Sequence, residues 1–548
     1  MNSSEEREPQ IGSDQYQYQE DQIKHEINNN QNKNNDEIQR SGIIRESDHV
    51  ELYGGVDDNF NSNLEIPANE LSGDEHDEKE CANSIAISQF KVDGQKKKQN
   101  IFFGGVTVMK TIVGSGILGL PNVMGNFGII FGTLLFTGIL FLNQYTVGLL
   151  IKSKNLCGRS NFCTIGLSAV HINMKYVVNL IVITNNIGVC MVEMVIFGNT
   201  AQNLLGMIDK NLVTHWYAQF RFLTFLSSLL ISPLIFVKSI DKLKHVALFA
   251  IVSIFLFSIC TVVTFFDEYK LDGNQHFVDN VYWFIPSDFN FPKAMGQFPV
   301  LLLAFGFHFN LFPIYKSLDA PSDKKGKAVS FGGLFSSYVL YMVVAIMGYL
   351  AYGKNVKVDF IDTIDENHVG TFLYAVLNLS FVISTTFSFP IMFFGARNNL
   401  FSLISDLRAR QRKDHFRSLQ KSAIEYSKAD KSQNRQSLLV SKNRNIKEET
   451  GITGIFFYIL TSIVYALVVG TAIIVGNIEP IFNVIGSIDS TAICYVLPCL
   501  FYIKLTRKNN FSNIHYLASW VIMIFSSIVA VTCLTCNYLY TDDTGKQE

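Results

Sequence analysis

The sequence carries little charge for its length. Asp, Glu, Lys and Arg make up 17% of its 548 residues, whereas an average soluble domain has about 25%. The chain also has no phosphate-binding loop, no zinc-ligand spacing and no nucleophile motif. These absences exclude an ATP-driven pump, a metal-dependent enzyme and a nucleic-acid-binding protein. We therefore expect no enzymatic activity, no cofactor and no nucleic-acid partner.

Cysteine is scarce, and the N-terminus has no apolar run. Most of the nine cysteines lie in apolar stretches or in loops predicted to be cytosolic, so we expect no structural disulfide. A cleaved signal peptide is not expected either, because it needs an apolar core. Residues 1–99 are rich in Asn, Gln, Asp and Glu, which predicts a disordered cytosolic tail. Binding of a cytosolic partner is one function that such a tail can have.

What the sequence does have is long apolar runs. A membrane-spanning helix needs about 20 mostly apolar residues, and hydrophobic residues make up 48% of the chain. This pattern predicts an all-α polytopic membrane protein in a lipid bilayer, with a transmembrane domain over residues 100–540. The eleven predicted spans lie near residues 101–120, 124–151, 177–206, 221–237, 246–266, 294–315, 329–353, 370–396, 453–476, 482–503 and 514–539.

The loops between these spans alternate in charge. Loops after the even-numbered spans are basic, above all residues 398–452, whereas the loops over 267–293 and 354–369 are acidic. Basic loops face the cytosol. We therefore predict a cytosolic N-terminus and a short outer or luminal tail over residues 541–548.

Glycine, proline and polar residues interrupt two of the spans. Span 1 contains Val113–Pro121 (VGSGILGLP), and span 6 contains Ala304–Pro313 (AFGFHFNLFP). Unwound backbone in a membrane is tolerated only where it is buried in protein or lines a cavity. Such breaks therefore point to a binding site. The alternatives are close packing of helices through small residues in span 1 and a simple proline kink in span 6.

The two breaks occupy matching positions in the chain. They open two sets of five spans, which we place at residues 100–266 and 294–503. Because five is odd, the second set is inverted relative to the first, and matching breaks are typical of inverted-repeat transporters. The span at 514–539 is left as an accessory helix.

Several motifs resemble one family. The segment Ile112–Pro121 resembles the first-helix signature of the amino acid/auxin permease family. Phe307–Tyr315, Gly348–Val356 and the stretch from Thr386 to Arg397 are similar to motifs of its sixth, seventh and eighth helices. The family includes sodium-coupled neutral, proton-assisted and vacuolar amino acid transporters. The resemblance implies an eleven-helix LeuT-type fold with substrate between helices 1, 3, 6 and 8.

The breaks suit the two charged ends of an amino acid. Backbone N–H groups at a helix N-terminus favour a carboxylate, and free carbonyl groups at Phe305 and Gly306 favour an ammonium group. The predicted substrate contacts are Thr111, Gly114, Ser115, Gly116, Asn185, Asn186, Phe305, Gly306, Phe307 and His308. His308 is alternatively a hydrogen-bonded structural residue. Phe309 and Asn310 depart from the family pattern, which leaves selectivity for the side chain open.

Ionisable and hydroxyl side chains inside the spans are candidates for ion coupling. Glu193 can carry a proton, because burial favours the neutral form of a carboxyl group, or it can pair structurally with a neighbouring helix. Lys110 stands where the sodium-coupled branch usually has Asn, and its charge would repel Na⁺, unless the side chain extends to the interface. The predicted coupling residues are Lys110, Glu193, Ser384, Thr385, Thr386 and Ser388.

The four hydroxyl groups of span 8 have two interpretations. They can hold Na⁺, with Thr386 and Ser388 first, or bond to carbonyl groups of their own helix. The prediction is a secondary active transporter of small neutral amino acids, with H⁺ as the coupling ion and Na⁺ as the alternative. The rival is an amino acid sensor that signals through residues 1–99. Either a plasma membrane or a vacuolar membrane fits.

Overall fold

The structure is a computed structural model that describes residues 99–237, 244–287, 289–364, 366–429, 454–506 and 513–544. The predictions for the tail before residue 99 and for the last four residues lie outside this part. Within it, nearly all regular structure is helical, and the one isolated β-bridge joins Gln99 and Leu318. The all-α fold class is therefore confirmed.

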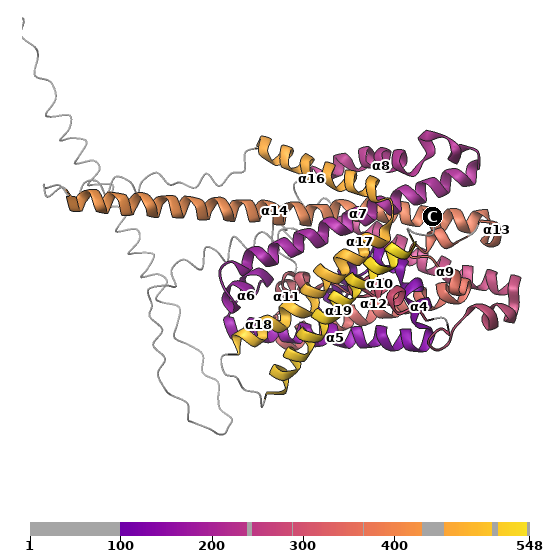
Figure 1. Ribbon diagram of the computed structural model, residues 1–548, viewed down its shortest axis with the longest axis horizontal. Coiled ribbons are helices and arrows are strands. Elements are labelled where there is room, and N and C mark those ends of the chain that lie inside the picture. Colours follow the sequence, from indigo (N-terminus) through magenta and orange to yellow (C-terminus); the bar gives the residue numbers. More distant parts are fainter. Residues whose placement is uncertain are drawn as a thin grey trace, which may run out of the picture. The chain divides into compact units, whose positions relative to one another are not determined.

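Figure 1 shows the order and arrangement of the helices in the described residues. In chain order they are α3 (Ile101–Ile112), η1 (Ser115–Gly119), α4 (Leu120–Phe127), α5 (Ile129–Cys157), α6 (Phe162–Ala169), α7 (Met174–Ile208), η2 (Leu212–Thr214), η3 (Trp216–Ala218), α8 (Phe220–Ile235), α9 (Lys244–Asn280), α10 (Phe291–Ala304), η5 (His308–Asn310), α11 (Leu311–Ser317), α12 (Asp323–Tyr352), η6 (Gly353–Asn355), η7 (Ile361–Thr363), α13 (Glu366–Val369), α14 (Thr371–Ala429), α16 (Gly454–Val475), α17 (Ile478–Val484), η9 (Ile485–Ser490), η10 (Ala492–Val496), α18 (Leu497–Leu505) and α19 (Ile514–Thr544).

The number of spans is close to the prediction. In the described residues, nine helical stretches are long and apolar enough to cross a membrane. A tenth span is the pair of helices over residues 101–127, which is bent by 62° at its break. The predicted span over 221–237 corresponds to α8, which has only 16 residues. The chain is thus an integral membrane protein, and a count of eleven spans stays a prediction.

The boundary between the first two spans differs from the prediction. The predicted bounds separate spans 1 and 2 at residues 121–123, but Pro121 stands in the first turn of α4, where its missing N–H and fixed φ are compatible with a helix start. The chain turns instead at Gly128, where φ is +76°. A Cβ atom at this position would lie 1.8 Å from the carbonyl oxygen of Phe284. Only glycine fits this turn.

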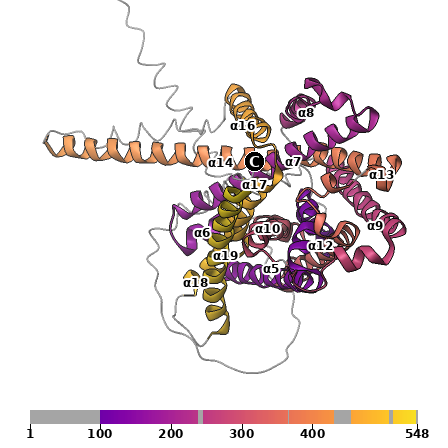
Figure 2. The same ribbon diagram turned by 45° about the vertical axis from the view of Figure 1, so that its right-hand side comes forward.

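The structure also differs from the predicted loop over residues 398–452. α14 continues without interruption to Ala429 and extends well beyond the other helices in both views (Figures 1 and 2). The physical reason is local, because residues 398–429 contain no glycine and no proline and are rich in good helix formers. Residues 430–453 lie outside the described part.

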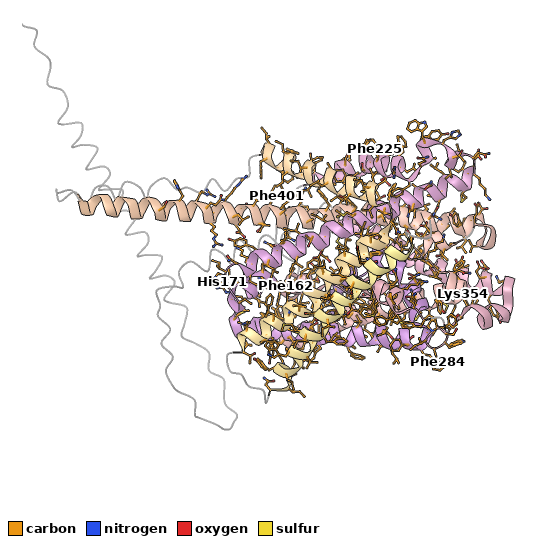
Figure 3. The ribbon with its side chains drawn as sticks, viewed as in Figure 1. Phe162, His171, Phe225, Phe284, Lys354 and Phe401 are labelled. Atoms are coloured by element: carbon orange, nitrogen blue, oxygen red, sulfur yellow. The ribbon has the colours of Figure 1, made fainter. Side chains whose placement is uncertain are left out.

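The connections divide between the two ends of the bundle. Figure 3 shows His171, between α6 and α7, and Lys354, after α12, at opposite ends. This placement agrees with the predicted alternation of loops, in which residue 171 is cytosolic and residue 354 is on the outer side. Which end faces the cytosol stays a prediction. Below, the end that holds His171 is called the predicted cytosolic end, and the end that holds Lys354 is called the predicted outer end.

Burial separates central from peripheral helices. In the most apolar 18-residue window, 83% of the α10–α11 span is buried, compared with 17% of α19. Phe225 on α8 is half exposed and lies near the edge of the molecule in Figure 3. Exposed apolar side chains on the outer helices suit contact with lipid, whereas α10 and α11 form part of the core.

α7 and α14 are joined at their predicted cytosolic ends. Lys175 Nζ lies 2.9 Å from Asp406 Oδ2, and both side chains are buried. Arg410 Nη1 donates to Asn173 Oδ1 at 2.8 Å. A buried ion pair with a good partner is costly to break, so these contacts hold α7 and α14 together at this end.

Candidate functional site

The first helix break lies between α3 and η1. α3 ends at Ile112, and Gly114 has an extended backbone. The N–H groups at the start of the next helical segment have no partner within that segment. Ser115 and Gly116 therefore present donors, and a positive helix end, at this point. A Cβ atom at Gly116 would lie 3.3 Å from both Cα and Cβ of Ala304, so the two breaks approach closely here.

The second break lies between α10 and η5. α10 ends at Ala304, and the chain resumes helical structure at His308. Gly306 N donates to the carbonyl of Leu303 at 3.0 Å, which tightens the last turn. The carbonyl groups at this end carry the negative pole of α10. The site thus has a donor side from the first break and an acceptor side from the second.

Tyr341 of α12 links the two breaks. Its hydroxyl group lies 2.8 Å from the carbonyl oxygen of Ile112 and 3.1 Å from that of Ala304. These carbonyl groups belong to the last residues of α3 and α10. Tyr341 is fully buried, and its ring contacts that of Phe305 edge-on at 5.3 Å. In the sequence Tyr341 is one hydroxyl-bearing residue within an apolar span. Its link between the two breaks was therefore not predicted.

A cavity of about 330 Å³ lies at the breaks. It extends along α3 as far as Gln99, toward the predicted cytosolic side. Its wall comes from α3, α7, α9, α10 and α14 and from both breaks. The lining residues are Gln99, Thr107, Lys110, Thr111, Ile112, Val113, Gly114, Ser115, Gly116, Asn185, Asn186, Val189, Glu193, Ala250, Ile251, Ile254, Leu303, Ala304, Gly306, Phe309, Asn310, Ser388, Ile391 and Met392.

The structure therefore brings together seven of the ten predicted substrate contacts. Thr111, the triplet 114–116, Asn185, Asn186 and Gly306 share the cavity wall. α9 and the N-terminal half of α14 also contribute lining residues that the sequence did not single out. These are mostly apolar, so nothing in their composition separated them from lipid-facing residues.

Three predicted contacts lie away from the cavity wall. Phe305, Phe307 and His308 are fully buried and are not among the lining residues. His308 Nε2 lies 2.9 Å from the hydroxyl group of Thr146 on α5. Phe305 packs edge-on against Phe136, also on α5. This environment matches the structural alternative for His308, and only the main chain of Phe305 is retained below as a substrate contact.

Lys110 stands in the last turn of α3 and lines the cavity. A cation at this position is favoured by the negative end of the helix dipole. In the described residues Lys110 has no ion pair with Glu193 or any other acid. Its positive charge therefore acts on the cavity beside the first break.

Glu193 lies on α7 and also lines the cavity. It is 2% exposed. Its Oε1 accepts a hydrogen bond from the Ser388 hydroxyl of α14, while Oε2 has no hydrogen-bond partner among the described residues. A buried charge without a partner is costly. The free oxygen atom is thus available to a proton or to a group that enters the cavity.

The other hydroxyl groups of α14 bond within their own helix. Thr385 Oγ1 donates to the carbonyl of Phe381 at 2.8 Å, and Thr386 Oγ1 donates to that of Val382 at 2.6 Å. Neither these two residues nor Ser384 lines the cavity. Of the four predicted coupling hydroxyls, only Ser388 faces it.

The span from α17 to α18 passes close to the second break in an unusual helical form. Residues 485–490 and 492–496 are π-helical, a conformation that is frequent at functional sites. Ser490 Oγ lies 3.4 Å from Asn185 Oδ1 on the cavity wall. Single-residue propensities do not predict a π-helix, and this feature was also missed.

Comparisons with known proteins match this architecture. A model of the family described as "Transmembrane amino acid transporter protein" matches residues 97–539. Amino acid transporter AVT6E of Arabidopsis thaliana is 22% identical over 459 residues, which span 80% of this chain and 84% of that protein. Vacuolar amino acid transporter 5 of Saccharomyces cerevisiae is 23% identical over 426 residues, which span 74% of this chain and 89% of that protein.

Solved structures with a similar arrangement are more distant. MhsT in complex with L-phenylalanine is 13% identical, with a TM-score of 0.46, and the match covers 81% of this chain and 100% of MhsT. The manganese transporter of Eremococcus coleocola, in complex with an aromatic bis-isothiourea compound, is 11% identical, with a TM-score of 0.43. That match covers 87% of this chain and 90% of the manganese transporter.

Proposed function

Since this chain belongs to the transmembrane amino acid transporter family, we propose that it moves small neutral amino acids across a membrane by alternating access, with H⁺ as the coupling ion. The observation that carries the proposal is the meeting of two helix breaks at one cavity. A donor end and an acceptor end face each other there, linked by Tyr341.

The substrate is placed by the opposite polarity of the two breaks. Its carboxylate is bound by the backbone N–H groups of Gly114, Ser115 and Gly116, with Lys110 adding positive charge nearby. Its ammonium group is bound by carbonyl groups at the end of α10, including those of Phe305 and Gly306. Both charged groups of the zwitterion thus gain partners, and these interactions offset the free-energy cost of removing the charges from water.

The wall beyond these groups supports a neutral side chain. Val189, Ile251, Ile254, Ile391 and Met392 make it largely apolar. Asn185 and Asn186 add hydrogen-bonding groups without net charge. A small aliphatic or hydroxyl-bearing side chain of the substrate carries no charge, so it needs no ionic partner in this wall.

Glu193 is the proposed proton carrier. Its free carboxylate oxygen faces the same cavity as the substrate, so occupation of one site alters the free energy of the other. Na⁺ coupling has less support, because Lys110 places a positive charge beside the first break and because only one hydroxyl of α14 faces the cavity. Both relatives are named as amino acid transporters, which gives the sensor alternative no support.

A vacuolar membrane is the proposed location. It rests on the name of the yeast relative, vacuolar amino acid transporter 5. In this location the predicted outer loops face the lumen, and the cavity opens toward the cytosol.

Uptake into proteoliposomes tests this proposal. The full chain is reconstituted, and labelled alanine, serine and glutamine are offered under an imposed pH gradient or an imposed Na⁺ gradient. We expect accumulation under the pH gradient alone. Accumulation that requires Na⁺ would contradict H⁺ coupling, and binding without any uptake would favour the sensor.

A further inference from the structure

A second polar site lies in the segment between α12 and α14, on the predicted outer side. The segment bridges two elements of the transport site. At one end, Asn122 Nδ2 of α4 donates to the carbonyl of Val356 at 2.7 Å. At the other end, Asn199 and Asn203 of α7 contact Asp362. α4 follows the first break and α7 lines the cavity, so this segment holds together two walls of the outer half.

Apolar side chains anchor the middle of the segment. Phe360 and Ile361 are fully buried. The Phe360 ring packs edge-on against Phe257 of α9 at 6.2 Å and against Tyr352 of α12 at 5.9 Å. Burial of a large aromatic side chain is favourable, so the segment is held closed while its polar groups are satisfied.

The polar groups are two acids one helical turn apart. Asp359 is 6% exposed. Its Oδ1 accepts from the backbone N–H of Ile361 at 3.2 Å, and its Oδ2 meets no donor within hydrogen-bond geometry among the described residues. The side-chain amide of Asn199 also interacts with this carboxyl group. Asp362 lies within 3.5 Å of the Asn199 amide nitrogen and 3.3 Å of that of Asn203. The two carboxyl groups are near enough that the charge of Asp362 acts on Asp359.

Few charges offset this pair. Lys357, an exposed residue of the same segment, is the cation that acts on both acids. α7 offers only the amides of Asn199 and Asn203 at this level. The neighbouring elements carry Glu268 on α9, Tyr352 at the end of α12 and Glu366 on α13, which add no positive charge.

Two negative charges at this place are unfavourable. Burial, reinforced by the charge of Asp362, raises the pKa of Asp359 to about 8. Burial also raises the pKa of Asp362. A carboxyl group with a raised pKa stabilises the closed form at low pH, below its ordinary pKa of 3.8. This stabilisation is lost as the pH rises toward 8.

We propose that Asp359 and Asp362 form a proton-binding site that latches the segment over residues 353–364 to α7. One proton held between the two carboxyl groups keeps the segment closed over the outer half. Loss of this proton leaves two buried carboxylates, and the segment is released from α7. This site is separate from Glu193, and it makes opening on the outer side depend on the pH of that side.

Hydrogen exchange of the full chain in lipid nanodiscs tests the latch. The amides of residues 362–364 donate within the η7 turn and report its opening. Between pH 5.5 and pH 8.5, we expect their exchange to increase by at least about tenfold after correction for the intrinsic effect of pH. Because the pKa of Asp359 is about 8 in the closed form and 3.8 ordinarily, its carboxyl group loses about a factor of ten in its preference for the closed form with each pH unit between pH 5.5 and pH 8.

Variants of the two acids distinguish release of the segment caused by loss of their proton from a general increase in hydrogen exchange at high pH. Asp359→Asn keeps the acceptor for Ile361 but cannot ionise, so its segment should stay protected at both pH values. Asp362→Asn should behave in the same way and serves if the first variant does not fold. The control is Asp209→Asn, an exposed acid after α7, which should retain the wild-type response. This readout does not require transport, so its failure is distinct from a failure of the proposed function.

Two results would overturn the latch. One is wild-type protection that does not change between pH 5.5 and pH 8.5, or an unchanged pH response in both acid variants. The other is a response to Ca²⁺ or Mg²⁺ at constant pH that EDTA abolishes and that replaces the response to pH. In that case the carboxyl groups bind a divalent cation rather than a proton.

Discussion

We expect the Glu193→Gln variant to exchange labelled alanine across the membrane but not to accumulate it under a pH gradient. Gln has nearly the same size as Glu and can still accept a hydrogen bond from Ser388, but it cannot take up or release a proton. With no coupling free energy between proton and substrate, the accumulation ratio should fall to about one. Counterflow and gradient-driven uptake, measured in the same proteoliposomes, check both halves of this prediction.

A half-buried acid on another helix provides the control for Glu193. Glu479, in the first turn of α17, is hydrogen-bonded to Gln297 and does not line the cavity. Glu479→Gln should therefore keep pH-driven accumulation. If Glu193→Gln loses exchange as well as accumulation, Glu193 is a structural residue. If the variant keeps both, its carboxyl group is not the proton carrier.

The second large effect is expected at Gly116, where the two breaks meet. A Cβ atom there would already lie 3.3 Å from Ala304, and the two methyl groups of Val would push α10 away. Overpacking of this kind costs about 1–3 kcal/mol. The free protein relieves this cost by moving the two breaks apart, whereas substrate binding needs them close together, so we expect about a 5- to 150-fold loss of substrate affinity. Substrate-induced thermal stabilisation of the purified variant measures this loss.

Gly138 offers a matched control for Gly116. It lies on an exposed face of α5, and a Cβ atom there would meet nothing within 4 Å. Gly138→Val should leave affinity unchanged, and Gly116→Ala should have a smaller effect than Gly116→Val. Full affinity in a monodisperse Gly116→Val variant would show that the two breaks do not need this close approach.

The sequence was sufficient to predict most of the spans and the two breaks. Apolar runs longer than any soluble core needs mark the helices, and glycine and proline within them mark the unwound backbone. Lys110 and Glu193 were also predictable, because charged side chains are rare in membrane spans. The structure places both on one cavity, although they are 83 residues apart.

The directions of side chains at the second break were not predictable. Helical periodicity assigns faces only while the helix continues, and it fails between Ala304 and His308. Phe305, Phe307 and His308 were therefore taken as substrate contacts, whereas they pack away from the cavity. Tyr341 was missed for another reason. Its two carbonyl partners are the ends of helices that are distant in sequence, and only the folded chain brings them together.

The length of α14 was predicted wrongly because of its basic residues. The density of Arg and Lys after residue 397 was interpreted as a loop, because basic loops mark the cytosolic side. Charge places a segment on one side of a membrane, but it does not prevent a helix. The absence of glycine and proline from residues 398–429 was the more informative signal.

The most direct test of proton-coupled transport is to measure proton movement caused by the substrate. Proteoliposomes that contain the full chain and a trapped pH-sensitive dye are given alanine, with no pH gradient and no Na⁺. The account predicts that alanine entry acidifies the lumen in wild type and leaves the lumenal pH unchanged in Glu193→Gln. Alanine entry into wild-type vesicles without any change of lumenal pH would contradict it.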